Sequence, residues 1–357
     1  MRPSFARLSS LLRYLSAVLC FLTAAAARAD LVWSKDTGWR VEGGALAGLT
    51  GADGRKALDL MNAARAAEEK GSTGTAIGDY ASVSKKFPNS IYAPEAFYRS
   101  AKLRLAKRDY AKAFEDFQQV VTRYPNTKRF NEIIGEQYGI ARALLDGARG
   151  RMFFGLLPGF VSRERAIGYF ETVLANAPYS DYAPLSLMNI AIGHQKLKNT
   201  EDAIDALDRM INTYPQSLLA PDAYLRMAQI EATQVEGPYY DQAATKESIT
   251  YFTDFMLLFP SDGNIAAAEK GLDGMKTMLA ESKMKMADFY FYRRNNLTAA
   301  RVFYNEAITT YPDSAIAKRA KLRLADVEAR ASGKPIAPEG RAPGDAQPKR
   351  KKIFGIF

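Results

Sequence analysis

The sequence predicts an all-α protein in which helix–turn–helix repeats stack into a solenoid. The first observation behind this prediction is a self-similarity between residues 76–90 and residues 113–127, which lie 37 positions apart. Both segments carry small, apolar and aromatic residues in the same order, and they end in F-P-N-S and Y-P-N-T. The second observation is that prolines continue the same frame along the chain. A recurring period of this size is typical of helical repeat arrays.

Six prolines close the repeated segments: Pro88, Pro125, Pro178, Pro215, Pro260 and Pro312. Twelve residues before each is a small side chain: Ala76, Ala113, Ala166, Ala203, Ser248 and Ala300. Eight residues before each is a large apolar one: Tyr80, Phe117, Phe170, Leu207, Phe252 and Tyr304. These positions share one face of a helix, and the proline ends that helix because it has no backbone N–H. We expect five to six such units within residues 57–331.

Residues 1–29 have the pattern of a secretory signal peptide. Arginines precede an apolar run from Tyr14 to Ala27, and Ala27-Arg28-Ala29 is a small-x-small cleavage pattern. Cys20 is the one cysteine, and lipid attachment to it is disfavoured because Leu19 stands where a small residue is needed. Removal of the signal peptide would then leave a chain without cysteine, beginning at Asp30, in which disulfides contribute nothing to stability.

Residues 30–56 form an N-terminal arm ahead of the repeats, and it contains both tryptophans. Trp33 and Trp39 flank a turn-like D-T-G, so the arm is either a short hairpin or an extended segment. It either packs on the first repeat or binds a partner. The first helix is expected from Leu58 to Lys70. Three insertions follow, at residues 146–161, at residues 235–241, and in a helix lengthened from Ala266 to about Arg293.

Residues 332–357 predict a disordered basic tail with an apolar tip, because proline, glycine and alanine dominate without apolar periodicity. The tail ends in K-R-K-K at residues 349–352 and I-F-G-I-F at residues 353–357. It fits an anionic membrane surface, a partner groove or a solvated charge run. The net charge of +10 comes mainly from the two ends of the chain. The near-neutral body argues against nucleic acid as a partner.

No arrangement in the sequence indicates catalysis, a metal site or a cofactor, and we predict that the protein is not an enzyme. His194 is the only histidine, so no second imidazole and no mature cysteine can complete a metal site or a nucleophile–base pair. The glycine-rich segment at residues 147–159 lacks the Gly-Lys-Ser/Thr ending of a phosphate-binding loop. We therefore expect a binding surface.

Stacked helix pairs present an extended concave face that can hold a peptide or a partner helix. Aromatic residues and arginine dominate the energetics of such interfaces. In the first repeat units the candidates for this binding are Tyr92, Tyr98, Arg99, Arg104 and Tyr138.

These motifs together resemble the BamD family, periplasmic tetratricopeptide-repeat lipoproteins of outer-membrane barrel assembly. The shared features are A-I-x-x-Y at residues 76–80, the F-P-N-S and Y-P-N-T closers, and F-F-G at residues 153–155. The most specific one is M-A-D-F-Y-F-Y-R-R at residues 286–294, which runs into A-A-R at residues 299–301. The similarity covers about residues 58–330. Phe303 departs from it, because the family commonly has an arginine at about that position.

The resemblance implies a scaffold at the inner face of the outer membrane, in the periplasm, with peripheral membrane association. Its N-terminal repeats would bind unfolded outer-membrane proteins, which makes the five candidates above client-binding residues. Its C-terminal repeats would dock on the barrel-assembly component through basic residues, here Arg293, Arg294 and Arg301. Two alternatives stay open. One is an adaptor of the type of the Tol–Pal-associated coordinator, and the other is a repeat protein that binds murein.

Overall fold

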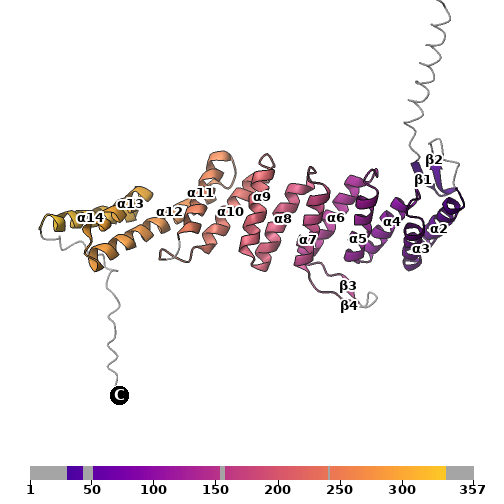
Figure 1. The fold of residues 1–357 in the computed structure, drawn as a ribbon, viewed down its shortest axis with the longest axis horizontal. Helices are drawn as coiled ribbons and strands as arrows, with labels where there is room; N and C mark the ends of the chain where they lie inside the picture. The colour runs from indigo at the N-terminus through magenta and orange to yellow at the C-terminus, as the bar shows by residue number, and fades with distance from the viewer. Residues whose placement is uncertain (1–29, 43–50, 153–156, 240–241, 335–357) are drawn as a thin grey trace, which may run out of the picture. The chain divides into compact units, whose positions relative to one another are not determined.

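The repeats predicted from the proline frame are present as pairs of helices in the computed structural model (Figure 1). The structure describes residues 30–42, 51–152, 157–239 and 242–334. The predicted signal peptide with Cys20, the F-F-G motif and the tail from residue 335 on lie outside these ranges. The chain divides into two compact units at residues 189 and 190, within α8 (Tyr182–Leu197), and each unit is described by itself.

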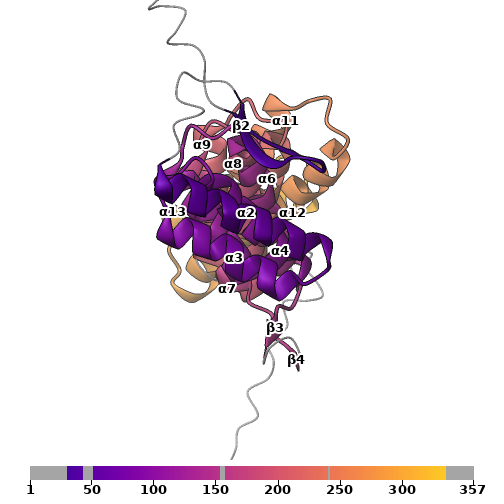
Figure 2. The same cartoon turned by 90° about the vertical axis from the view of Figure 1, so that its right-hand side faces the viewer.

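The first unit begins with an antiparallel hairpin of β1 (Asp30–Ser34) and β2 (Gly38–Glu42), in which Trp33 lies opposite Trp39. The hairpin lies over the first helices (Figure 2). Helices follow in this order: α2 (Ala52–Glu69), α3 (Thr73–Lys86), α4 (Ala93–Ala106), α5 (Tyr110–Arg123), α6 (Phe130–Leu145) and α7 (Arg163–Asn176). Two short paired strands, β3 (Arg151–Met152) and β4 (Leu157–Pro158), stand in the predicted insertion between α6 and α7.

The second unit contains the end of α8 and the later repeats. Its elements are α9 (Thr200–Thr213), α10 (Ala220–Gln234), α11 (Ala243–Leu258), α12 (Ile265–Asp288), the π-helical turn η2 (Phe289–Arg293), α13 (Leu297–Thr310) and α14 (Ala315–Ala331). The predicted lengthening to about Arg293 is confirmed, because α12 continues into η2 without a break. The π-helical character of that turn is new information, and such turns occur frequently at functional sites.

The first helix of each repeat ends two residues before its closing proline, and the residue between them is the C-cap of that helix. These C-cap residues are Phe87, Tyr124, Ala177, Tyr214, Phe259 and Tyr311. The small residues of the frame, Ala76 through Ala300, have no exposed surface. They sit at helix crossings, where a larger side chain would hold the backbones apart. The large residues of the frame are also buried, so the predicted core face is confirmed.

The first helix begins earlier than predicted, at Ala52 instead of Leu58. Its buried face is Ala57, Met61 and Ala64, one residue per turn. This face packs against Tyr80 and Val83 of α3 and against Trp39 of the hairpin. The helix therefore begins inside the predicted arm of residues 30–56, beside Gly51 and Gly54. Both tryptophans pack on the first repeat, as one of the two predicted alternatives requires.

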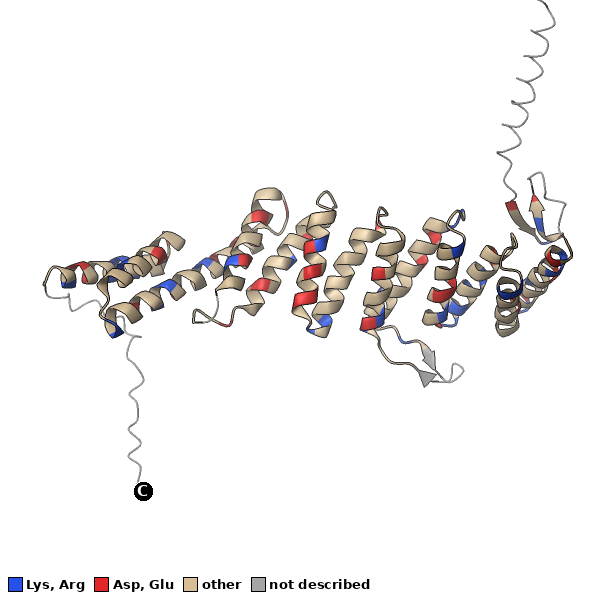
Figure 3. Ribbon diagram, viewed as in Figure 1, with Lys and Arg blue, Asp and Glu red and all other residues tan. Residues whose placement is uncertain are grey.

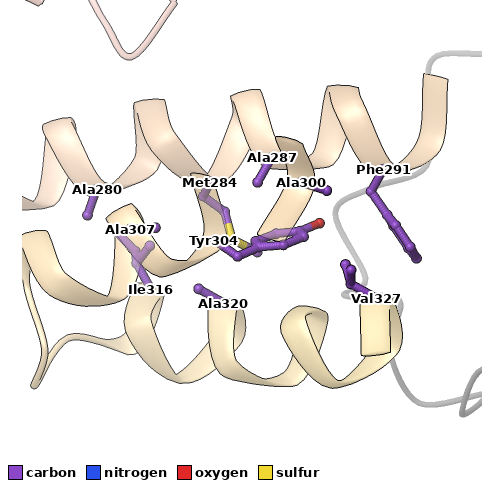
Figure 4. Close-up of a cluster of buried hydrophobic side chains, with 10 residues drawn as sticks. All are labelled: Ala280, Met284, Ala287, Phe291, Ala300, Tyr304, Ala307, Ile316, Ala320 and Val327. Carbon is purple, nitrogen blue, oxygen red and sulfur yellow. The ribbon is translucent and has the colours of Figure 1, made fainter. Parts of the chain in front are cut away.

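The last three helices enclose a core of their own, which Figure 4 shows. Tyr304 of α13 lies between Met284 and Ala287 of α12 on one side and Ala320 of α14 on the other. Phe291 of η2 belongs to the same cluster. In the described ranges no helix is long and apolar enough to cross a membrane.

Candidate functional site

The three tyrosines predicted as client contacts lie in the core of the first unit. Tyr92, Tyr98 and Tyr138 are 2%, 7% and 8% exposed. Tyr98 packs on Phe117 with 6.0 Å between ring centroids, and its hydroxyl donates to Glu132. Burial and that carboxylate raise the pKa of Tyr98. These aromatic residues fill the contacts between helices and expose little surface. Their contribution to client binding stays a prediction.

The two arginines predicted beside them are engaged in ion pairs within the first unit. The Nε atom of Arg99 lies 2.9 Å from Glu95 and its NH1 atom 3.6 Å from Glu68. The Nε atom of Arg104 lies 2.8 Å from Asp116. Both guanidinium groups keep only a minor part of their surface exposed. A client would have to compete with these carboxylates for the arginines.

A ladder of charged and aromatic side chains joins the hairpin to successive helices. The Arg65 guanidinium stacks 4.3 Å from the Trp33 ring, and that of Arg99 lies 5.4 Å from the Trp39 ring. Further along, Arg129 pairs with Glu95 and lies 4.4 Å from the Tyr98 ring. Cation–π contacts of this kind contribute about 0.5–2 kcal/mol each, depending on how far water is excluded. The hairpin is therefore anchored to α2 and α4 by both of its tryptophans.

A groove opens beside the hairpin, between β1 and the ends of α4, α5 and α6. Its volume is about 680 Å³. Apolar side chains of Leu31, Ile91, Val120 and Ile133 line it. Its charged lining consists of Asp30, Glu95, Arg123, Lys128, Arg129 and Glu132. The Nζ atom of Lys128 lies 2.6 Å from the Asp30 carboxylate. This ion pair connects the turn before α6 to the first residue of β1. The sequence did not reveal this groove, because its residues belong to β1, α4, α5, α6 and adjoining turns, which only the fold brings together.

The predicted docking arginines lie on the surface of the second unit, where Figure 3 shows basic residues on the last helices. Arg293 is exposed at the end of η2. The guanidinium of Arg294 lies 5.5 Å from the Phe289 ring. Arg301 makes a two-pronged pair with Glu328, with 2.8 Å from Nε and 3.1 Å from NH2. An exposed pair contributes at most about 1 kcal/mol, so a partner carboxylate can displace Glu328 at little cost.

Next to these arginines is an exposed apolar patch of Met286, Phe289 and Tyr292. These side chains are 41%, 46% and 46% exposed. Arg323 of α14 is buried beneath the patch and donates from NH1 to the Tyr292 hydroxyl at 2.6 Å. Sequence reasoning missed Arg323, although it lies on the buried face of α14 with Ala320 and Val327. A basic rim around exposed aromatics has the composition of a protein interface.

Another residue missed from the sequence is Glu231 of α10, whose side chain is only 3% exposed. Burial and the neighbouring carboxylate of Glu247 on α11 raise the pKa of Glu231 to about 7. Glu201 of α9 adds to this effect, and Gln234 opposes it by donating a hydrogen bond at 3.2 Å. Carboxylates also gather on α9 in this unit (Figure 3). Glu231 is therefore a neutral acid below pH 7 and a buried anion above it.

Replacing Glu231 by glutamine should stabilise the second unit at pH 8 by about 2–3 kcal/mol. The raised pKa means that Glu231 contributes most to the stability of the wild type at low pH. The wild type loses this contribution as the pH rises from the unfolded-state value of about 4.3 towards 7. Urea unfolding at pH 5 and pH 8 measures the difference. Glu236→Gln, at an exposed position, is the control. An equal pH dependence in wild type and Glu231→Gln would contradict the assignment.

The search for chemistry in the described residues gives no catalytic arrangement. His194 lies 3.4 Å from Asp202 through Nδ1, within the second unit. No group of three or more histidine, cysteine or acidic side chains in the described part of the chain is placed to hold a metal ion. The exposed aromatic and basic side chains of the second unit are typical of a protein-binding surface.

Comparison with known proteins supports the same conclusion. Residues 161–333 match a family described as outer membrane lipoprotein, and residues 95–127 match a tetratricopeptide repeat. Among curated proteins, the outer membrane protein assembly factor BamD of Xylella fastidiosa is 24% identical over 182 residues, which cover 48% of this chain and 62% of that protein. BamD of Caulobacter vibrioides is 26% identical over 134 residues, covering 38% and 44%. The C-terminal part of the repeat array, residues 161–333, is therefore similar to BamD proteins. The matches span less than two thirds of either relative.

Solved structures of repeat proteins are also similar to this chain. A tetratricopeptide repeat protein from Parabacteroides merdae is 13% identical, with a TM-score of 0.31, covering 75% of this chain and 98% of that chain. MamA from Desulfovibrio magneticus is 16% identical, with a TM-score of 0.30, covering 59% and 99%. The BamD-like family match includes the exposed arginines 293, 294 and 301.

Proposed function

We propose that this protein is a periplasmic scaffold of outer-membrane protein assembly, which binds unfolded client segments and a barrel-assembly partner without catalysis. The observation that carries the proposal is the family match over residues 161–333, which contains an exposed basic and aromatic surface at η2 and α13. The named relatives are assembly factors for outer membrane proteins. The chain is proposed to act at the inner face of the outer membrane.

The partner is proposed to dock on the second unit through Arg293, Arg294 and Arg301 together with Phe289 and Tyr292. Aromatics and arginine are the residue types that most often dominate binding energy at interfaces. Partner carboxylates would pair with the three arginines, while an apolar side chain covers the aromatic patch. Complementary charge would raise the association rate and fix the orientation of docking. Clients are proposed to bind the first unit.

Reversing the three charges together, with Arg293→Glu, Arg294→Glu and Arg301→Glu, should weaken partner binding at least about tenfold while leaving the helical content unchanged. The measurement is affinity purification of the tagged protein from its own cell envelope, with quantitative mass spectrometry of the partners. The control reverses three exposed charges of α14, at Lys318, Arg319 and Lys321. It makes the same change in net charge while leaving the three docking arginines and the aromatic patch unaltered.

The same purification tests the proposed function as a whole. Enrichment of a barrel-assembly component with the wild type and the α14 control, and its loss from the triple variant, supports the docking surface. Retention by the triple variant removes the docking role of the arginines. Recovery of Tol–Pal components, or binding to isolated murein sacculi in place of assembly proteins, would overturn the proposal in favour of one of the alternatives.

A further inference from the structure

The two edges of the N-terminal hairpin differ in their surroundings. The outer edge of β2 is closed by α2, because the backbone N–H of Trp39 donates to Oδ1 of Asn62 at 2.9 Å. Gly38 also approaches Asn62 so closely that a Cβ atom there would clash with it. The Trp39 side chain is buried in the first core. No further strand can therefore pair with β2.

The hydrogen bond between Trp39 and Asn62 also shows which backbone groups of β1 point away from β2. Trp33 lies opposite Trp39, and the amide of Trp39 points to Asn62, so these two residues form a pair without mutual backbone hydrogen bonds. Such pairs alternate along an antiparallel ladder, which places the backbone groups of Leu31 and Trp33 on the outer edge. No backbone or side-chain group in the described residues bonds to the main chain of either one. Such an edge is a template for another strand.

The open edge borders the groove described above. Asp30 and Leu31 contribute to its lining, whereas no residue of β2 does. The start of α6 also lines it, and Ile91 is the exposed large apolar side chain among its lining residues. Arg123 is exposed at the rim. The groove is thus lined by both apolar and charged residues. At its β1 side lie the outward backbone groups of Leu31, to which no group in the described residues bonds.

We infer that β1 binds a client as an added third strand of the hairpin, with every second side chain of the client directed into the groove. This inference rests on the proposed function, and it specifies how the first unit would hold an unfolded outer-membrane protein. Strands of outer-membrane barrels alternate apolar and polar residues. The apolar set matches the apolar lining of the groove, and the polar set faces its charged lining and water.

Pairing through the main chain also explains how one site can serve many clients. Strand addition takes its affinity from backbone hydrogen bonds, which every non-proline residue supplies, and its selectivity from pockets for alternate side chains. The site therefore distinguishes an alternating segment from a segment of the same composition in another order. It requires no consensus sequence in the client.

The two tryptophans make binding at the hairpin directly measurable, because the chain has no others. The probe is a synthetic peptide of about ten residues, the length of a membrane strand, in which Val and Leu alternate with Thr and Ser. Titration into the mature full-length protein should change the tryptophan emission and saturate. A peptide of identical sequence that is N-methylated at alternate residues loses the donors of one edge. It should bind at least about tenfold more weakly.

The matched protein variants are Leu31→Pro and Leu31→Ala. Proline removes an outward N–H of β1 and places its ring on the open edge, at a position where no bond to β2 is lost. Alanine removes the same leucine side chain and keeps the N–H. We expect Leu31→Pro to bind the probe at least about tenfold more weakly than Leu31→Ala, since the two variants lose the same side chain and differ in the N–H. Thermal unfolding monitored by circular dichroism establishes that both variants fold.

Equal binding of the N-methylated and unmodified peptides would overturn the inference, as would equal binding by the two Leu31 variants. Absence of any saturable change in emission would overturn it as well. Aggregation of an unfolded outer-membrane protein, measured by light scattering, separates this result from the proposed function. Suppression of aggregation by wild type and by Leu31→Pro alike would keep the scaffold and remove the added strand. Failure of wild type to suppress it would count against the scaffold itself.

Discussion

Replacing Phe117 by alanine is expected to lower the free energy of unfolding of the first unit by about 3–5 kcal/mol, because it opens a large cavity in a close-packed core. Phe117 has no exposed surface. Its ring packs against Tyr98 of the preceding repeat at 6.0 Å. It also occupies the large apolar position that recurs eight residues before each closing proline. The substitution therefore tests the repeat frame and the contact between neighbouring repeats at once.

Urea unfolding monitored by circular dichroism measures this loss. Tyr179→Ala is the matched control, since that aromatic ring is 100% exposed and its removal should change stability by less than about 0.5 kcal/mol. In repeat arrays each unit contacts mainly its neighbours, so the damage should stay local and the transition should become broader. An effect of Phe117→Ala no larger than that of Tyr179→Ala would contradict the buried position of the ring.

A loss of about 3–5 kcal/mol is also expected in the second unit for Tyr304→Ala. Tyr304 is fully buried among α12, α13 and α14 (Figure 4). Its hydroxyl donates to Oδ1 of Asp288 at 2.5 Å. Burial and the Asp288 carboxylate raise the pKa of Tyr304, so the hydroxyl keeps its proton across the physiological range. The side chain therefore both fills the core and holds the end of α12, where the π-helical turn begins.

Tyr304→Phe separates these two contributions. It keeps the ring and removes the hydroxyl, and it should cost about 0.5–1.5 kcal/mol. Thermal unfolding of the alanine and phenylalanine variants measures the loss of stability in each. The difference between the two losses is the contribution of ring packing. If both variants lose the same stability, the hydrogen bond rather than the ring stabilises this core. The Tyr304→Phe variant should also bind the proposed partner less well if the bond positions η2.

The recurrence of these residues explains why so much of the fold was predictable. Ala113 and Phe117 are four residues apart, so they must share a helix face, and Pro125 must end that helix. The same reasoning held in every repeat, including the lengthened α12. The start of α2 was predicted late: its first turn, from Ala52, is mostly exposed, so no buried apolar residue marks the helix before Ala57.

The candidate sites were predicted less well, because exposure depends on contacts between repeats. Tyr98 and Arg99 looked like a binding pair in the sequence, but Phe117 and Glu132 cover Tyr98, and Glu95 and Glu68 hold Arg99. Glu231 looked like a solvated carboxylate until α11 placed Glu247 against it. Apart from Glu95, which lies one turn from Arg99 in the same helix, the deciding neighbours belong to other helices.

The sequence by itself determined the repeat frame, the buried face of each helix and the similarity to BamD in the C-terminal half. These properties depend on the periodicity of one chain segment, which is local. Only the tertiary structure decided which edge of the hairpin is open, how separate elements form the groove beside it, and which arginines remain exposed. Those properties depend on distances between residues that the chain separates and packing brings together. The physical reason is that a helix face is fixed by 3.6 residues per turn, whereas a surface is what the packed neighbours leave uncovered.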